Sequence, residues 1–409
     1  MTHPTGARGR YRDALAVPEF RTLFLSHVLC MLGTMVTQFA LTVLVYRQSG
    51  SPLLAALVFT VAFVPYLFGG VLLSALVDRV AIRRLLVGCN LLTAALAAAM
   101  TLPGLPVAVV LALALGMGLV APVFAGARAA MLPRVLDGDV YIAARSLFRL
   151  VAQGAQVSGF ALGGLLLIAL TPRAALMLNT GAFLLSAALL AAGLTARPAV
   201  SAGTRSLVSD SLTGLGRIFR QARLRRVLVF GWAVPALGVA PEALAAPYAD
   251  LAGFGTAGLG LLMSALPVGT VLGELLCLWI PSPARRLRLI TPLALLVFLP
   301  QLLFGLRPGL PLAITLLVLS GLGLAHHLGL DQLLMDAAPE ELLGRALSIQ
   351  TAGLMFWQGV GFAVAGAAAQ FASPSLVITV TAALGLLLVP LLRLGRDDPG
   401  NGDARRTAP

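Results

Sequence analysis

The stretch Gln-Val-Ser-Gly-Phe-Ala-Leu-Gly-Gly at residues 156–164 decides the fold, because the chain contains it twice. It recurs 202 positions later as Gln-Gly-Val-Gly-Phe-Ala-Val-Ala-Gly at residues 358–366. The same shift brings a Thr-Pro pair at 171–172 onto a Ser-Pro pair at 373–374. Since the repeat spans half of the 409 residues and keeps its direction, the sequence predicts two copies of one structural unit.

Composition indicates the medium in which these two units fold. Hydrophobic residues make up 59% of the chain and charged residues only 11%, whereas an ordinary soluble domain is about 25% charged. Apolar runs of about 20 residues fill nearly the whole length, and none alternates with a period of two. Because backbone polar groups in lipid must bond within their own segment, these runs predict α-helices and exclude a β-barrel.

The sequence therefore predicts an all-α membrane protein of twelve transmembrane helices in two pseudo-symmetric six-helix bundles. We place the first bundle at 1–196, a cytoplasmic Arg-rich linker at 197–226, the second bundle at 227–394 and a cytoplasmic tail at 395–409. The first 21 residues are expected to be a polar tail and not a removable signal peptide. The predicted spans are 22–46, 53–77, 85–102, 107–127, 147–170, 174–196, 227–249, 258–281, 289–305, 309–332, 346–372 and 375–392.

The placement of the 29 basic residues, all of them Arg, predicts the orientation. Only Arg47, Arg173 and Arg307 fall in loops on one side of the predicted membrane. By the positive-inside rule, both termini are then cytoplasmic. The net charge of +13 is spread over thin loops, so it favours anionic lipid head groups of a cell membrane over nucleic acid. Exclusive use of Arg, with much Ala, Gly and Leu, suggests a GC-rich bacterial genome.

Small residues at repeated positions predict close helix packing. Glycines spaced four apart on span five let another helix approach closely, and span eleven repeats this pattern with Gly and Ala. The dispersion attraction between such closely packed helices stabilises their association, which lipid does not otherwise reward. The packing role is assigned to Gly159, Gly163, Gly164, Gly361 and Gly366.

The loop between spans two and three carries the most specific local motif, Ser-Ala-Leu-Val-Asp-Arg-Val-Ala-Ile-Arg-Arg at residues 74–84. It resembles the signature loop of the major facilitator superfamily, Gly-x-x-x-Asp-Arg-x-Gly-Arg-Arg, without its two glycines. An acid at a helix end favours a neighbouring helix N-terminus and nearby Arg. We therefore expect Asp78, Arg79, Arg83 and Arg84 to form a latch that controls rocking of the two bundles. The alternative is a basic cytoplasmic turn with an incidental acid.

The resemblance to this superfamily covers nearly the entire chain, and two stretches are similar to its exporters. Residues 159–164 match the span-five motif Gly-Pro-x-x-Gly-Gly, with Phe160 in place of Pro. Residues 122–133 look like the corresponding stretch of macrolide-efflux-like exporters. The resemblance implies a monomeric secondary transporter that exports a hydrophobic drug or natural product in exchange for protons. Uptake by the same superfamily is the alternative. The acid often found in span one of such exporters is missing here.

Polar groups inside the predicted spans are functional candidates, because their burial in lipid is costly. Glu242 in span seven and Glu274 in span eight are candidates for proton coupling, since a desolvated carboxyl can exchange a proton. The alternatives are a cap on a helix break after Pro241 and a packing or gating hydrogen bond for Glu274. The resemblance implies that spans one, four, seven and ten line a central cavity. The cavity candidates are Gln38, Asn90, His326 and His327.

Two further classes of protein are disfavoured. An enzyme is not expected, because the chain has no Lys for a P-loop or a Schiff base and no grouped nucleophile, base and orienting residue. No metal or cofactor is predicted, because Cys–His metal spacing and the motif His-Glu-x-x-His are both missing. A transport-dead sensor or scaffold would carry a long soluble domain, whereas the tail comprises only residues 395–409.

Overall fold

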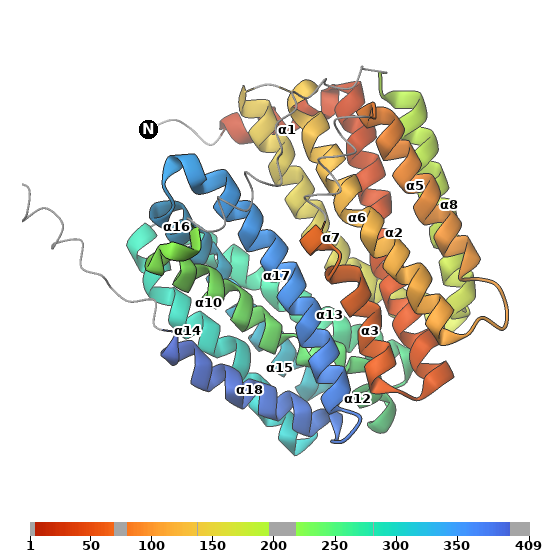
Figure 1. Cartoon of the computed structure of the whole chain (residues 1–409), viewed down its shortest axis with the longest axis vertical. Helices are drawn as coiled ribbons and strands as arrows, with labels where there is room; N and C mark the ends of the chain where they lie inside the picture. The colour runs from red at the N-terminus through yellow and green to blue at the C-terminus, as the bar shows by residue number, and fades with distance from the viewer. Residues whose placement is uncertain (1–4, 69–79, 137, 196–217, 281, 393–409) are drawn as a thin grey trace, which may run out of the picture.

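The computed structural model describes residues 5–68, 80–136, 138–195, 218–280 and 282–392. Figure 1 shows the helices of the first half at the upper right and those of the second half at the lower left. The first half comprises α1 (Thr5–Ala16), α2 (Pro18–Ser49), α3 (Pro52–Phe63), α5 (Ile82–Ala99), α6 (Val107–Met131), η1 (Leu132–Arg134), α7 (Gly138–Ala169) and α8 (Pro172–Gly193). The second half comprises α10 (Ala222–Gly238), α11 (Ala240–Ala243), α12 (Ala245–Leu251), α13 (Gly255–Leu278), α14 (Pro283–Leu302), η2 (Leu303–Leu306), α15 (Leu310–Gly323), α16 (His326–Ala337), α17 (Glu340–Ala368) and α18 (Pro374–Leu391).

These elements confirm the predicted all-α membrane fold. Within the described residues, eleven helical segments are long and apolar enough to cross a membrane. The remaining span, the second in order, is a shorter apolar helix described from Pro52 to Phe68. The boundaries of the two bundles and of the linker remain predictions, because residues 196–217 and 393–409 lie outside the described part of the chain.

Three helices begin with the same local device, and the repeat explains two of them. The side chains of Ser51, Thr171 and Ser373 each accept a hydrogen bond from the backbone N–H three residues later. A Pro follows each of these residues, at the first helical position. A polar cap satisfies a backbone donor that the helix start leaves free, and Pro has no N–H to satisfy there. The Thr-Pro and Ser-Pro pairs of the repeat are therefore helix starts.

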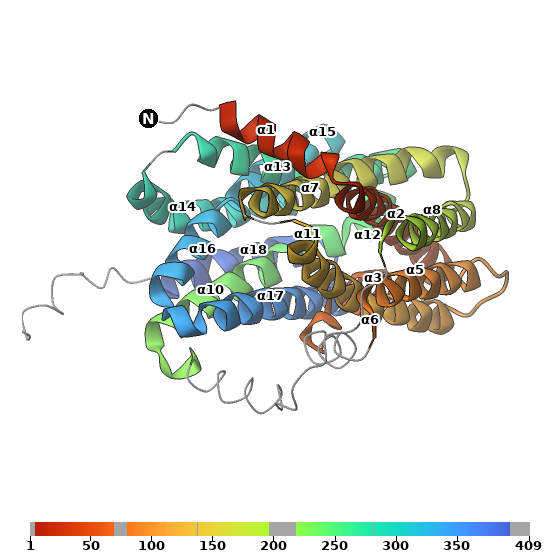
Figure 2. The same cartoon turned by 90° about the horizontal axis from the view of Figure 1, so that it is seen from above.

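The two halves contact each other through symmetry-related helices. Helix α7 packs against α13, and α3 packs against α17. The shift of 202 positions carries α7 onto α17 and α3 onto α13, so each contact is the counterpart of the other. In Figure 2, seen from above, these helices lie at the boundary between the halves. The repeat therefore encodes both the halves and the way they meet.

Span seven is not the single helix that the sequence predicted at 227–249. It divides into α10, α11 and α12, with breaks at Val239 and Leu244. Pro241 at the start of α11 lacks the N–H that an unbroken helix would direct at an earlier carbonyl. The missing bond is to the carbonyl of Leu237, and at the next carbonyl, that of Gly238, the side chain of Gln301 in α14 donates a hydrogen bond at 3.3 Å. A neighbouring helix thus satisfies the backbone group that the break releases.

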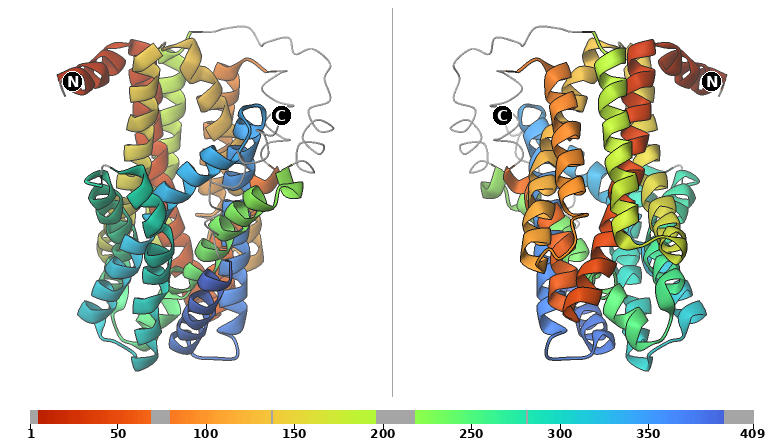
Figure 3. Two further views of the ribbon diagram at one scale, coloured as in Figure 1. Left: turned by 90° about the vertical axis from the view of Figure 1, so that its left-hand side faces the viewer. Right: turned by 90° about the vertical axis from the view of Figure 1, so that its right-hand side faces the viewer.

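Two other elements also differ from the predictions. Span ten divides at Leu324 and Ala325 into α15 and α16, which places the two histidines at the start of the second segment. Residues 5–16, expected to be part of a polar tail, form α1, whose Ala14 is completely buried and which packs against α7. Figure 3 shows α1 projecting sideways from the top of the bundle.

Candidate functional site

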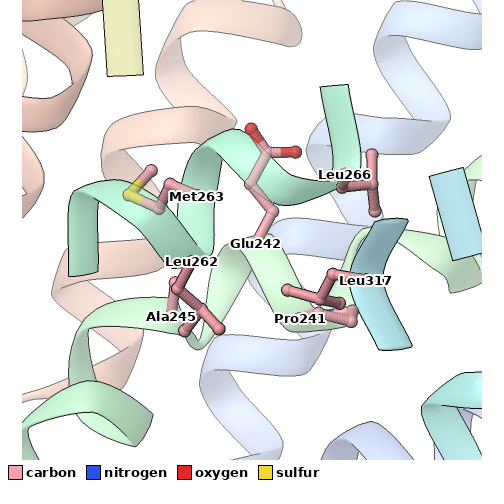
Figure 4. Close-up of a pocket in the computed structure, with 7 residues that line it drawn as sticks. All are labelled: Pro241, Glu242, Ala245, Leu262, Met263, Leu266 and Leu317. Atoms are coloured by element: carbon pink, nitrogen blue, oxygen red, sulfur yellow. The ribbon is translucent and has the colours of Figure 1, made fainter. Parts of the chain in front are cut away.

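Glu242 lines a small pocket in the second half. The residues around it come from α11, α12, α13 and α15, and all except Glu242 are apolar. Figure 4 shows the Glu242 side chain extending from α11 toward α13, between Met263 and Leu266. The full lining is Pro241, Glu242, Ala245, Leu262, Met263, Leu266 and Leu317.

The carboxyl group of Glu242 is half-buried and lies between the two breaks of span seven. Within the described part of the chain, the structure records no hydrogen bond or ion pair to it. The caps of α11 and α12 use no side-chain hydrogen bond, so Glu242 does not cap the break after Pro241. An acid among apolar side chains inside a membrane span is costly and is therefore a candidate functional residue.

Glu274 and the two histidines lie elsewhere in the second half. Glu274 is partly buried in α13 and has an interaction partner. His326 is 1% exposed, and its Nδ1 donates to the Gly323 carbonyl at 2.9 Å, while its Nε2 has no recorded partner. The rings of His326 and His327 are stacked, with centroids 4.3 Å apart. Their side chains therefore lie together at the start of α16.

The two polar candidates of the first half have different surroundings. Asn90 is 2% exposed and donates to Ser186 Oγ at 2.7 Å, while Cys30 donates to its Oδ1 at 3.4 Å. These contacts place Asn90 inside the bundle, where it joins α5 to α8 and α2. Gln38 in α2 is buried, and its Nε2 has no recorded partner. The structure brings neither side chain to the Glu242 pocket.

Only part of the signature loop is described. Asp78 and Arg79 lie outside the described residues, so the latch remains a prediction. The Arg83 guanidinium donates to the carbonyl of Ala191, in the last turn of α8, and Arg84 is exposed. A cation near a helix C-terminus is favourable, because unpaired carbonyls gather there. Arg83 thus joins two helices of the first half.

The repeated glycines occupy corresponding positions in the two halves. Gly159 and Gly163 face Met35 and Phe39 of α2, the first span of their own half. Gly361 faces the backbone of α10, the first segment of span seven. Each of these positions brings a helix close to the first span of its bundle.

Two further glycines face the opposite half. A Cβ added at Gly164 would lie 2.7 Å from the Cα of Gly260 in α13. A Cβ added at Gly366 would lie 2.6 Å from the Cβ of Ala56 in α3. At both places the helix backbones approach so closely that no side chain fits without a shift.

Polar and aromatic contacts, which sequence analysis did not find, join the halves at the end of the molecule that carries Gly50, hereafter the Gly50 end. The rings of Phe59 in α3 and Phe362 in α17 stack, with centroids 4.6 Å apart. The side-chain contacts recorded between the halves lie in the part of the bundle nearer this end. The polar pairs are Tyr46 Oη with Asp250 Oδ2 at 3.5 Å, Arg47 Nη2 with Thr256 Oγ1 at 2.9 Å, Gln370 Nε2 with Ser51 Oγ, and Thr60 Oγ1 with the Gly359 carbonyl at 3.1 Å.

Arg128 and His27 form a second feature that sequence analysis did not identify. The Arg128 guanidinium in α6 donates to His27 Nδ1 in α2 and lies over the ring of Phe148 in α7, at 4.9 Å. His27 is 2% exposed. Each residue could have been noticed alone, because a polar side chain within or beside an apolar run is unusual. The sequence does not show that the two residues are in contact, because 101 positions separate them.

Comparison with known proteins supports the fold. The family model of the Major Facilitator Superfamily matches residues 23–335. The structure is similar to that of a mutant of the nucleoside transporter NupG, at 12% identity and TM-score 0.73 over 92% of this chain and 98% of that chain. It is similar to the peptide transporter POT in complex with sulfate, at 14% identity and TM-score 0.73 over 94% and 99% of the two chains.

A third similar structure is a bacterial homologue of the human lysosomal transporter Spinster, in an inward-facing and unoccupied conformation. It has 12% identity and a TM-score of 0.64 over 92% of this chain and 94% of that chain. No curated protein matches the sequence. The structural likenesses show the fold, while the family match covers well over half of the chain. The protein is therefore a multi-pass membrane transporter of small molecules, and it belongs to the Major Facilitator Superfamily.

Proposed function

We propose that the protein exports a hydrophobic or amphipathic small molecule across the cell membrane in exchange for protons. The observation that carries this proposal is the carboxyl group of Glu242, in an apolar pocket between two breaks of span seven. Discontinuous helices in transporters supply sites for substrates and coupling ions. Glu242 would bind a proton in one conformation and release it in the other, as the polarity around the pocket changes.

The contacts between the halves support one direction of opening. They join the halves at the Gly50 end, which the distribution of Arg places outside the cell. In this arrangement the protein would be closed to the outside and ready to receive a substrate from the cytoplasm. The likeness of two sequence stretches to exporters of the superfamily favours export over uptake. A monomer suffices for this cycle, since both halves belong to one chain.

The test is transport by inverted membrane vesicles under an imposed proton gradient, with a panel of hydrophobic antibiotics. We expect gradient-dependent accumulation by the wild-type protein. Glu242→Gln should abolish it while preserving substrate binding and exchange, because the amide cannot carry a proton. Glu274→Gln is the matched control and should have a milder effect, since Glu274 lies outside the pocket.

Three transport results would contradict this proposal. Full gradient-driven export by the Glu242→Gln protein would reject the role of this carboxyl group. Accumulation only in right-side-out vesicles would establish uptake. Absence of transport in both directions, by a correctly inserted protein that binds substrate, would favour a sensor.

A further inference from the structure

Arg128 places a positive charge at the end of the first half opposite to the Gly50 end, and the proposed proton exchange does not use it. It lies in the last turn of α6. Its guanidinium donates to His27 Nδ1, while the other ring nitrogen, Nε2, faces the carbonyl of Phe148 at 3.4 Å. A ring nitrogen that accepts a hydrogen bond from a cation carries no proton, so the single ring proton lies on Nε2. His27 therefore orients Arg128 as a neutral acceptor.

The other recorded neighbours of the Arg128 guanidinium are two phenylalanine rings and, through electrostatic interaction, Tyr66 and Cys30. Its carbon lies 4.9 Å from the ring centre of Phe148 and 6.0 Å from that of Phe124. The contacts recorded for it in the described part of the chain are thus with neutral groups. A guanidinium presents five N–H donors in a planar fork that fits carboxylate, sulfonate or phosphate oxygens, and the bond to His27 uses only one of them.

The position of this group suits a site on the transport path. His27 and Arg128 come from spans one and four, and Phe148 comes from span five, which packs on the second half. Arg128 is only partly buried, so part of the residue remains accessible. A charged side chain held in a membrane protein at this cost is generally retained for function.

We infer that Arg128, oriented by His27, binds an anionic group of the transported molecule. The substrate class is then an apolar, preferably aromatic, compound with one carboxylate, sulfonate or phosphate group. The cation binds the anionic group, while Phe124, which is only partly buried, contacts the apolar body. This inference rests on the proposed function for its place in the transport cycle, but binding at Arg128 requires neither a proton gradient nor Glu242.

The test uses two fluorescent probes that differ by one charged group. Anilinonaphthalene sulfonate carries a sulfonate on the aromatic skeleton, and phenylnaphthylamine lacks it. Both are titrated into purified protein in vesicles of neutral lipid. We expect Arg128→Gln to weaken binding of the sulfonate by about tenfold, the usual effect of one charge-assisted hydrogen bond, and to leave the neutral probe unchanged. Arg128→Lys should fall between, because it keeps the charge and loses the fork.

Arg145→Gln is the matched control. Arg145 is an exposed Arg in α7 that lies 5.9 Å from the ring centre of Tyr141. Like Arg128 it is charged and has an aromatic neighbour, but unlike Arg128 it is exposed. Its replacement should leave the binding of both probes unchanged. If Arg128→Gln does not fold, the comparison of Arg128→Lys with the wild type decides, with weaker sulfonate binding and unchanged binding of the neutral probe as the expected result.

Three results would overturn the inference. Equal loss of both probes in a folded Arg128→Gln protein would assign the residue to packing, and unchanged binding of both would exclude an anion site. In a third arm, anionic phosphatidylglycerol is added to the vesicles. Displacement of the sulfonate by this lipid from the wild type but not from Arg128→Gln would identify a lipid head-group site instead. Failure of proton-driven export would leave all these binding results valid, so the two proposals are tested separately.

Discussion

At the scale of single residues, the contact between Gly164 and Gly260 predicts how much side chain the boundary between the halves tolerates. Gly164→Ala would place a methyl group 2.7 Å from the Cα of Gly260. We expect the variant to unfold at a lower temperature. The free energy of unfolding should fall by about 1–3 kcal/mol, which is typical of overpacking.

Gly154→Ala on the same helix is the control, because Gly154 is exposed and a Cβ there meets nothing within 4 Å. It should stabilise α7 by about 0.5–1 kcal/mol through reduced backbone entropy. Thermal unfolding of the purified proteins in one detergent gives both values. Equal melting temperatures for the two variants would contradict the close approach of α7 and α13.

A second residue-scale prediction concerns Asp78 in the signature loop. Asp78→Asn should leave expression and membrane insertion intact and slow transport strongly, because the amide binds Arg and a helix N-terminus less well than the carboxylate does. Asp13→Asn, at an exposed position of α1, is the control for loss of one negative charge. Unchanged initial rates of transport for Asp78→Asn at equal expression would reject the latch.

Sequence analysis singled out a candidate site residue only where its immediate neighbours in the chain made it unusual. Glu242 stood out because one acid in a long apolar run is costly, and the structure places it in an apolar pocket. Arg128 and His27 were not identified as a site, because their relation depends on packing of α2 against α6 across 101 positions. Asn90 was expected at a cavity, but hydrogen bonds to the neighbouring helices place it inside the bundle.

At the scale of elements, the break in span seven predicts a dependence on a residue of another helix. Gln301 is fully buried and donates to the Gly238 carbonyl and to Ser320 Oγ, at 3.3 and 2.8 Å. Gln301→Leu should destabilise the protein by about 1–3 kcal/mol, because it leaves buried polar groups unpaired.

Pro241→Ala should reduce that loss, because Ala favours a continuous helix in which the N–H of Glu242 can reach the Gly238 carbonyl. The measurement is a double-mutant cycle on thermal unfolding with Pro241→Ala and Gln301→Leu. The double variant should have a higher free energy of unfolding than the sum of the two single effects predicts. Pro122→Ala serves as the control pairing, since Pro122 lies inside α6, in the other half of the molecule. Strict additivity for Pro241 and Gln301 would reject the compensation.

Elements were predictable in position but not in continuity. Hydropathy located the spans, because lipid requires long apolar helices, and the repeat located their counterparts. Whether Pro bends or interrupts a helix depends on partners such as Gln301, which stands 63 positions from the carbonyl that it binds. Helix α1 was missed because its polar sequence carries no hydropathy signal, although it packs against α7.

At the scale of the whole molecule, the distribution of Arg predicts the topology. Reporter fusions at Gly50 and Ser373 should be located outside the cell, and fusions at Ala81, Thr213 and the C-terminus inside. The physical basis is the cost of moving positively charged loops across the membrane. The readout is a pair of reporters, one active only outside and one active only in the cytoplasm. Reversal at any one position would contradict the assignment.

The stacked rings of Phe59 and Phe362 predict the balance between the two conformations. Removing this contact with Phe59→Ala should shift the protein toward the state that is open at the Gly50 end, because an aromatic pair contributes about 0.5–1.5 kcal/mol. In a Met263→Cys background, labelling by an impermeant maleimide from outside should become about threefold to tenfold faster, as such a shift requires.

The control for this measurement is Phe183→Ala. Phe183 is buried in α8, and its recorded cluster lies within the first half, so its loss should not bias the opening of one end. Equal labelling rates in the Phe59→Ala and Phe183→Ala proteins would show that the aromatic stack does not hold the halves together.

The close approach of α7 and α13 at Gly164 also makes this point a pivot, which divides α7 into two parts of unequal length. Gly164 stands five residues before the end of α7 at Ala169 and 26 residues after its start at Gly138. At a rise of about 1.5 Å per residue, the two parts measure about 8 and 39 Å. A rigid rotation of α7 about Gly164 therefore moves its Gly138 end far and its Ala169 end, at the Gly50 end of the molecule, very little. Opening at the Gly50 end therefore requires helices to bend, and we expect this bending at the breaks of spans seven and ten.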